Sequence, residues 1–156
     1  MEEEAKHIEN PGIPMLHFSV QFQNVFVAEI VARRFPIDAS TYKPTDVETI
    51  VTLEGISVDT ATSIAQSILS IQVLLKNEPR LFEIAFKQVG LFTYSKDYSP
   101  EMVQTFLERG SLSVMLPFAR EMLVSICNRL QIPAIFLPMV PIISPSISNT
   151  PEEDVR

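Results

Sequence analysis

The sequence predicts an α+β fold, in which a four-stranded antiparallel sheet has helices packed on one face. Apolar and polar residues alternate along most of the chain up to Tyr94, which is the period of half-buried strands. After Tyr94 the apolar residues recur at the spacing of an amphipathic helix. Strands that come first and helices that follow are typical of a sheet with its helices on a single side.

The composition indicates one domain with more apolar surface than its core requires. The chain has 156 residues, of which 46% are hydrophobic and 10 are Phe, and its mean hydropathy is +0.19. A domain of this length buries roughly 70% of its unfolded surface. We therefore expect the surplus to serve a subunit interface or the recognition of an apolar ligand.

The charge and the cysteine content exclude several classes of function. The net charge is −7 and the 12 Lys and Arg residues are scattered, whereas nucleic-acid binding requires a basic surface. No apolar run reaches the ~18 residues that span a bilayer, so we expect no membrane insertion. The acidic start, Met1-Glu2-Glu3-Glu4, is unlike a secretory signal, and the single Cys127 excludes an intrachain disulfide. These features favour a cytoplasmic location.

The chain is predicted to consist of a flexible acidic leader over 1–14, a single domain over 15–145 and a flexible acidic tail over 146–156. One face of the first strand holds four apolar residues, Leu16, Phe18, Val20 and Phe22. The alternation slips near Asn24, after which Val25 and Val27 continue it. One extra residue that shifts the phase predicts a β-bulge.

Three further strands are predicted after a loop over 33–46 that contains Pro36 and Pro44. The β-branched run 47–53 and the alternating runs 64–75 and 80–94 suit strands. Turn chemistry is expected over 57–63 and at Lys76-Asn77-Glu78-Pro79. Short turns between neighbouring strands favour antiparallel pairing.

Two helices are predicted after the strands. Ser99-Pro100-Glu101 has the residues of a helix start, and Gly110 is a plausible stop. A second helix is expected over 113–130, with Pro117 either in its first turn or at a kink in one longer helix. From Gln131 onward the prolines exclude a regular helix before Pro145.

Residues of catalytic or metal-binding type are not grouped, so we expect a protein that is not an enzyme and has no cofactor or metal. The four glycines are too far apart for a phosphate-binding loop. His7 and His17 lack metal-ligand spacing to a cysteine or carboxylate. Cys127 is expected to be a buried structural thiol. A polar pocket around His17 or a carboxylate pair would favour the remaining alternative, a hydrolase-type enzyme.

Three segments together resemble the SecB-type protein-export chaperones. They are Gln88-Val89-Gly90-Leu91-Phe92 at the end of a strand, Leu116-Pro117-Phe118-Ala119-Arg120-Glu121 in a helix, and the loop from Ile132-Pro133 to Leu137-Pro138. Tyr42-Lys43-Pro44 is similar to the aromatic-x-Pro of the family's crossover loop. The middle segment is moderately specific, and the order and spacing of all the segments strengthen the resemblance.

The resemblance implies a homotetramer built as a dimer of dimers, which holds unfolded or pre-secretory polypeptides in apolar grooves without ATP. Such a groove must be apolar and adaptable, a task that suits Phe and Met. The candidate groove residues are Phe35, Ile37, Tyr42, Leu91, Phe92 and Tyr94. For the last three of these, burial in the core is the favoured alternative. The candidate structural or interface residues are Pro117, Phe118, Arg120 and Met122.

Several departures from the family argue against docking to the export motor ATPase. The family's acidic docking position in the last strand falls on Ala85, with Glu83 at a neighbouring apolar position, and the acid of the first strand corresponds to Asn24. The Val-Asn-Phe that usually follows the loop prolines is replaced by Met139-Val140-Pro141. The second hypothesis is therefore a SecB-like binding module dedicated to one partner, such as the antitoxin of a toxin–antitoxin pair.

Overall fold

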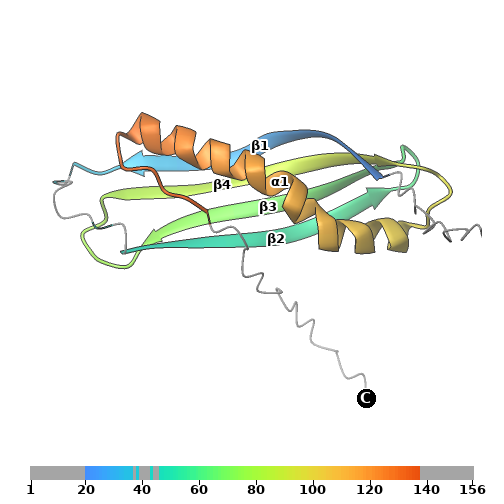
Figure 1. Ribbon diagram of the computed structural model, residues 1–156, viewed down its shortest axis with the longest axis horizontal. Coiled ribbons are helices and arrows are strands. Elements are labelled where there is room, and N and C mark those ends of the chain that lie inside the picture. Colours follow the sequence, from blue (N-terminus) through green and yellow to red (C-terminus); the bar gives the residue numbers. More distant parts are fainter. Residues whose placement is uncertain (1–19, 37, 39–42, 44–45, 138–156) are drawn as a thin grey trace, which may run out of the picture.

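The structure, a computed structural model, describes residues 20–36, 38, 43 and 46–137 (Figure 1). It contains strands β1 (Val20–Arg34), β2 (Val47–Asp59), β3 (Ile64–Leu75) and β4 (Phe82–Tyr94), followed by the helix α1 (Pro100–Leu130). The predicted leader, the predicted tail and most of the loop between β1 and β2 lie outside the described residues.

The four strands form one antiparallel sheet in the order β1-β4-β3-β2, which confirms the predicted fold class. Short turns join β2 to β3 and β3 to β4. The turn predicted over 76–79 is confirmed, whereas the turn predicted over 57–63 covers only 60–63, because residues 57–59 belong to β2. β1 instead pairs with β4, so the chain crosses the width of the sheet between β1 and β2. The two outer strands are therefore β1 and β2.

Bulges set the length and phase of the outer strands. The pairing of β1 with β4 shifts between Phe22 and Asn24, which confirms the predicted bulge, and shifts again between Val27 and Glu29. β2 continues to Asp59, beyond the predicted end at residue 53, because a bulge between Leu53 and Gly55 absorbs the break in alternation.

The structure confirms the alternative of one longer helix that contains Pro117, and the prediction of two separate helices is wrong, because α1 runs without interruption for 31 residues. Gly110 lies inside it, and packing on either side offsets the cost of a helical glycine. Pro117 is also internal and exposed, so its missing N–H leaves the carbonyl of Ser113 without its helical partner. The predicted start is confirmed, since the Ser99 hydroxyl accepts a hydrogen bond from the Met102 amide at 3.3 Å.

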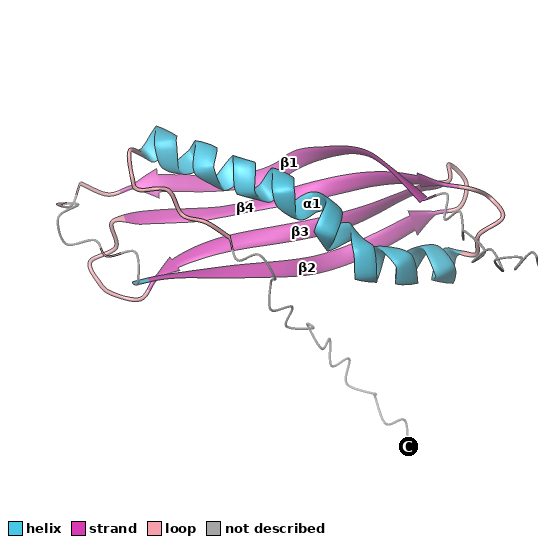
Figure 2. Ribbon diagram, in the orientation of Figure 1, coloured by secondary structure: helices cyan, strands magenta, loops and turns pink. Residues whose placement is uncertain are grey.

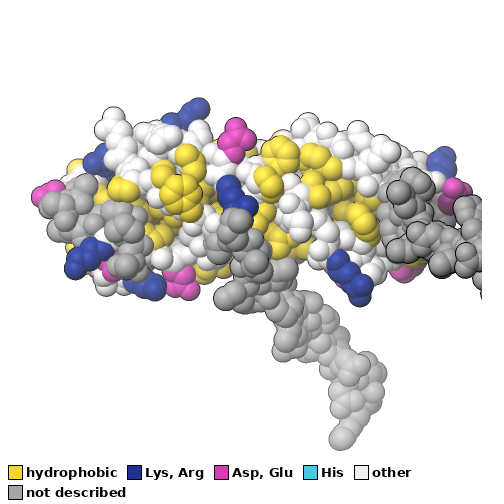
Figure 3. All heavy atoms as spheres, in the orientation of Figure 1, with side chains coloured by type: hydrophobic (Ala, Val, Ile, Leu, Met, Phe, Trp, Pro, Cys, Tyr) yellow, Lys and Arg dark blue, Asp and Glu magenta, His cyan; other side chains and the backbone are white. Residues whose placement is uncertain are grey.

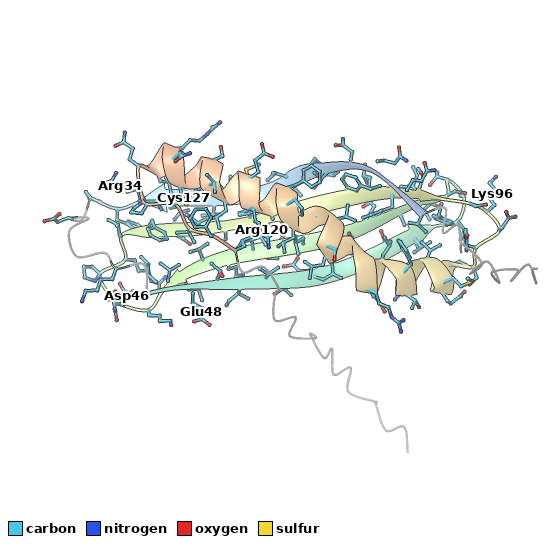
Figure 4. The ribbon with its side chains drawn as sticks, in the orientation of Figure 1. Arg34, Asp46, Glu48, Lys96, Arg120 and Cys127 are labelled. Atoms are coloured by element: carbon cyan, nitrogen blue, oxygen red, sulfur yellow. The ribbon has the colours of Figure 1, made fainter. Side chains whose placement is uncertain are left out.

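The helix ends where the sequence supplies a stop. Gln131 takes the left-handed conformation with φ of 54°, and Pro133 follows. The Arg34 side chain of β1 donates hydrogen bonds to the carbonyls of Leu130 and Gln131 at 3.1 and 3.2 Å. This cation therefore ties β1 to the negative end of the helix (Figure 4).

The molecule has two layers, since α1 and the segment 131–137 lie on the same face of the sheet (Figure 2). The residues buried between them divide into two clusters. The larger cluster lies under the C-terminal two thirds of α1 and includes Leu69, Ile71, Phe86, Met115 and Leu123. The smaller cluster lies under the first third of α1 and consists of Ala65, Phe92, Tyr94, Val103 and Leu107.

Candidate functional site

The structure does not bring the predicted groove residues together in the described part of the chain. Phe92 and Tyr94 face α1 and are buried in the smaller cluster, so they line no open groove in this structure. Leu91 directly precedes Phe92 in β4 and is half-buried on the opposite face of the sheet. The favoured alternative, burial in the core, is therefore confirmed for Phe92 and Tyr94.

Phe35 lies at the other end of the sheet, where its amide donates a hydrogen bond to the Leu81 carbonyl at 2.8 Å. Because β4 rises by about 3.3 Å per residue, Phe35 and Tyr94 are separated by roughly 40 Å. Phe35 is half-buried. Ile37 and Tyr42 lie outside the described residues, so a groove at this loop stays a prediction.

The exposed side of α1 carries a row of apolar side chains at a spacing of four residues. We call this row the apolar stripe; its members are Met102, Phe106, Val114, Phe118 and Met122, with Gly110 in the gap. Met102 is 50% exposed, Val114 37% and Phe118 38%. Residues four apart are neighbours on a helix surface, so the stripe is a continuous row that winds around the helix by about 40° at each step. Figure 3 shows hydrophobic side chains gathered on this side of the molecule.

The start and the middle of the apolar stripe have different surroundings. Near the start of α1, Met102, Thr105, Phe106, Arg109 and Gly110 line a hollow of about 330 Å³. Gly110 helps to form it, since a side chain there would meet only the Phe106 ring at 3.9 Å. The hollow is mostly apolar, which suits an uncharged side chain of a partner, and Arg109 places a cation in its lining.

Near the middle of α1 the apolar stripe continues onto the sheet through aromatic contacts. The ring of Phe118 packs against Phe22 of β1 with centroids 5.5 Å apart, and Phe22 contacts Phe92 edge-on at 5.6 Å. Phe118 therefore connects the exposed surface to the smaller cluster.

The predicted interface residues occupy the expected helix but have different environments. Pro117 and Phe118 are exposed, whereas Met122 is half-buried against the larger cluster. Arg120 is half-buried near the middle of the molecule (Figure 4). Their role between subunits stays a prediction.

The opposite face of the sheet carries apolar side chains bordered by paired charges. Phe26, Val89 and Ile68 lie side by side across β1, β4 and β3, and Phe26 is 46% exposed. Lys87 and Glu54 form an ion pair at 2.9 Å. The hydrogen bond and charge of Glu54 raise the pKa of Lys87, with a smaller contribution from the charge of Glu29.

The positions discussed for motor docking lie on this same face. Glu83 is paired with Arg33 at 3.7 Å, Ala85 stands opposite Val31, and Asn24 stands opposite Leu91. The Asn24 side chain accepts a hydrogen bond from the Val25 amide at 2.8 Å.

Chemically reactive groups are sparse in the described residues. Cys127 is fully buried in the larger cluster, as predicted, and burial raises the pKa of its thiol. Among the described residues, no three His, Cys, Asp or Glu side chains gather as metal ligands would. His7 and His17 lie outside this part of the chain.

By length and composition, α1 is apolar enough to cross a membrane, a property that core helices share. In this protein 44% of its most apolar window is buried. The helix is apolar on two sides because one side packs on the sheet and the other carries the apolar stripe.

Comparisons with known proteins support the fold rather than a family. A scan against protein-family models finds no match, and a search of curated proteins finds no relative. Among solved structures, the chain is similar to Rv1957, a SecB-like chaperone of Mycobacterium tuberculosis, in complex with a ChAD peptide from the Rv1956 HigA1 antitoxin. The identity is 16% and the TM-score 0.64, over 78% of this chain and 88% of that chain.

A protein of unknown function from Streptococcus agalactiae is also similar, at 13% identity and a TM-score of 0.39, over 78% of this chain and 98% of that chain. The similarity to Rv1957 shows that our chain has a SecB-like fold.

The sequence interpretation missed the apolar stripe as a separate surface. Met102, Phe106, Val114 and Phe118 recur in the sequence at a spacing of four or a multiple of four. The prediction of two separate helices assigned them to different elements, so they were not recognised as one row. The signal that would have found them is an apolar period on both sides of one uninterrupted helix.

Proposed function

We propose that this protein is a chaperone-like binding protein that holds extended segments of other polypeptides without ATP. The observation that supports it most is the apolar stripe, because a helix packed on a sheet needs one apolar side and α1 has two. The SecB-like fold is consistent with this function, and the neighbour Rv1957 is described as a chaperone that binds a peptide of an antitoxin.

The apolar stripe also supports the proposed assembly into a homo-oligomer, a dimer of dimers in the simplest form. Continuous apolar rows at a spacing of four residues pack well against the same row of a second helix. In this arrangement part of the stripe is covered by another subunit, and the hollow beside Met102 and Phe106 is left for the bound polypeptide.

A protein dedicated to one partner is the second proposal. It is favoured by the outer face of the sheet, where Lys87 neutralises Glu54, Arg33 neutralises Glu83, and Asn24 and Ala85 carry no charge. Such a face offers few free acids to an export motor. This face therefore favours binding of one dedicated partner over a role in general protein export. Both proposals include a cytoplasmic location.

The proposed activity is tested by mixing the purified protein with an unfolded client, such as reduced lysozyme, and following light scattering without nucleotide. Suppression of aggregation at near-stoichiometric ratios is expected. Met102→Glu/Phe106→Glu should weaken it by at least about tenfold, because each change removes one buried apolar contact. The matched control is Ser113→Glu/Asn128→Glu, which adds the same two charges at exposed positions of the same helix outside the hollow. Unchanged aggregation with the wild-type protein would exclude the function.

Affinity capture from the source cells distinguishes a general chaperone from a protein dedicated to one partner. A dedicated module should retain one protein at a fixed stoichiometry, whereas a general chaperone should retain many proteins in small amounts.

A further inference from the structure

On β3, β4 and α1 the boundary between the two core clusters consists of polar residues and glycines. On β3, Ser67 separates Ala65 from Leu69, and on β4, Gln88 and Gly90 separate Phe86 from Phe92. On α1, Gly110 and Ser111 separate Leu107 from Leu112. We call the row of Ser67, Gln88, Gly90, Gly110 and Ser111 the polar seam.

The polar seam is poorly satisfied although it is buried. Gln88 is 2% exposed and Ser111 1% exposed, and their side-chain oxygens have no hydrogen-bond partner among the described residues. Within the described part of the chain, the Ser67 hydroxyl donates to the sulfur of Met115, a weak acceptor, at 3.0 Å. A buried polar atom without a good partner costs free energy, so the contacts along this line stabilise the two halves of the core less than apolar contacts would.

The helix is also weak where it crosses the seam. Gly110 adds conformational freedom. Pro117, less than two turns later, deprives the Ser113 carbonyl of its helical hydrogen bond. Figure 1 shows α1 changing direction near its middle. Such bends are typical of glycine and proline positions in helices.

The first third of α1, residues 100–110, holds its helical shape by local bonds. Ser99 caps it, Thr105 donates to the Glu101 carbonyl at 2.9 Å, and Gln104 donates to Glu108 at 3.0 Å. Its buried contacts to the sheet come from Val103 and Leu107 in the smaller cluster. These local bonds, together with the continuous helix that follows, favour the helical shape of this segment independently of its contacts with the sheet.

We propose that residues 100–110 form a lid that hinges at Gly110–Pro117 and uncovers an apolar site on Ala65, Phe92 and Tyr94 for an extended polypeptide. The identity of the occupant rests on the proposed function, whereas the lid motion does not. Val103 and Leu107, four apart on the helix, project about 6 Å apart. Alternate side chains of an extended chain project about 7 Å apart on one face, so two apolar residues of a bound chain can replace them.

The motion is tested by introducing a second thiol with Leu107→Cys and following modification of both cysteines with N-ethylmaleimide by mass spectrometry. Cys127 is the internal reference, because it is fully buried in the larger cluster. Each rate is divided by the rate of the same site in the urea-unfolded chain. Global unfolding exposes both sites equally, whereas lid opening exposes only position 107. We expect position 107 to react at least about tenfold faster.

Gly110→Ala is the matched variant. Its added carbon makes only an ordinary contact with the Phe106 ring, yet alanine favours the straight helix. It should slow modification at position 107 about fivefold and leave Cys127 unchanged. If Leu107→Cys fails to fold, Val103→Cys reports on the same lid. Equal normalised rates at the two sites would overturn the proposal.

The occupant is tested with a fluorescent peptide that has Leu at alternate positions, Ser between them and Lys at both ends. At saturation it should accelerate modification at position 107 and leave Cys127 unchanged. A peptide of the same length and composition with a Leu-Leu-Ser-Ser repeat should bind at least about tenfold more weakly, since only half of its Leu side chains share one face of the extended chain. Binding without acceleration at position 107 would overturn this site. If neither peptide binds and the unfolded client still aggregates, both the proposed function and the proposed peptide site are wrong. The modification rates measured without peptide still test the lid motion by themselves.

Discussion

At Gly90 the backbone of β4 lies directly beneath Met115 of α1. A Cβ atom at Gly90 would stand 2.8 Å from the Met115 sulfur and 3.1 Å from the Phe92 ring. Both side chains are buried, so neither can withdraw into solvent. The glycine is therefore needed for the approach of helix and sheet, and the family-like Gly90-Leu91-Phe92 has a packing reason.

Gly90→Ala should lower the free energy of unfolding by about 1–3 kcal/mol, because it overpacks this contact. Gly55→Ala is the matched control in another strand of the same sheet, since a Cβ there meets nothing within 4 Å. It should be neutral or stabilise by less than about 1 kcal/mol. Urea denaturation measures both, and equal losses would contradict the packing role of Gly90.

Cys127 links stability to alkaline pH. Burial raises the pKa of its thiol in the folded protein, whereas an unfolded thiol titrates at about 8.5. The folded state then holds its proton more tightly, so this contribution is complete below about pH 8.5 and declines as the pH rises toward the folded pKa.

The difference in unfolding free energy between wild type and Cys127→Ala should therefore shrink between pH 7.5 and 10, by up to about 1 kcal/mol. Urea titrations at several pH values measure it. A constant difference across this range would show that the thiol is not desolvated.

At the scale of elements, the structure depends on how one helix reaches four strands. The apolar period of α1 was visible in the sequence, but its length was not, since Gly110 and Pro117 both have the local chemistry of a break. Burial of Val103 and Leu107 before Gly110, and of Leu112 and Met115 after it, keeps the two halves on the same sheet.

The contact between β1 and the end of α1 can be tested with neighbouring arginines. Arg34→Ala should cost about 1 kcal/mol, because it removes charged hydrogen bonds to two helix carbonyls. Arg33→Ala removes an exposed ion pair on the opposite face and should change stability by less than about 0.5 kcal/mol. Thermal unfolding compares them, and equal shifts would rule out the tie.

At the scale of the whole molecule, the excess of apolar residues found in the composition has a location. Part of it lies along the apolar stripe, part on the outer face of the sheet around Phe26, and Phe136 is the most exposed large apolar side chain of the described residues. A 17.6 kDa chain with this much open apolar surface is expected to cover part of it by assembly.

Val114→Glu/Phe118→Glu should therefore convert an assembled wild type into folded monomers, since two charges in a helix contact are costly. Light scattering gives the mass and circular dichroism the fold. Ser113→Glu, exposed on the same helix, should leave assembly unchanged. A wild type of 17.6 kDa in solution would remove the basis for this prediction.

The sequence by itself determined the fold class, the order of the elements, the bulge near Asn24 and the start and end of the helical region. These depend on period, turns and caps, which are local and can be read along the chain. The tertiary structure decided that one helix spans Gly110 and Pro117, that Phe92 and Tyr94 are covered while Phe35 lies at the far end, and that the core is divided by a polar seam. These depend on which distant residues meet, because packing between elements outweighs the local preference of a glycine or a proline.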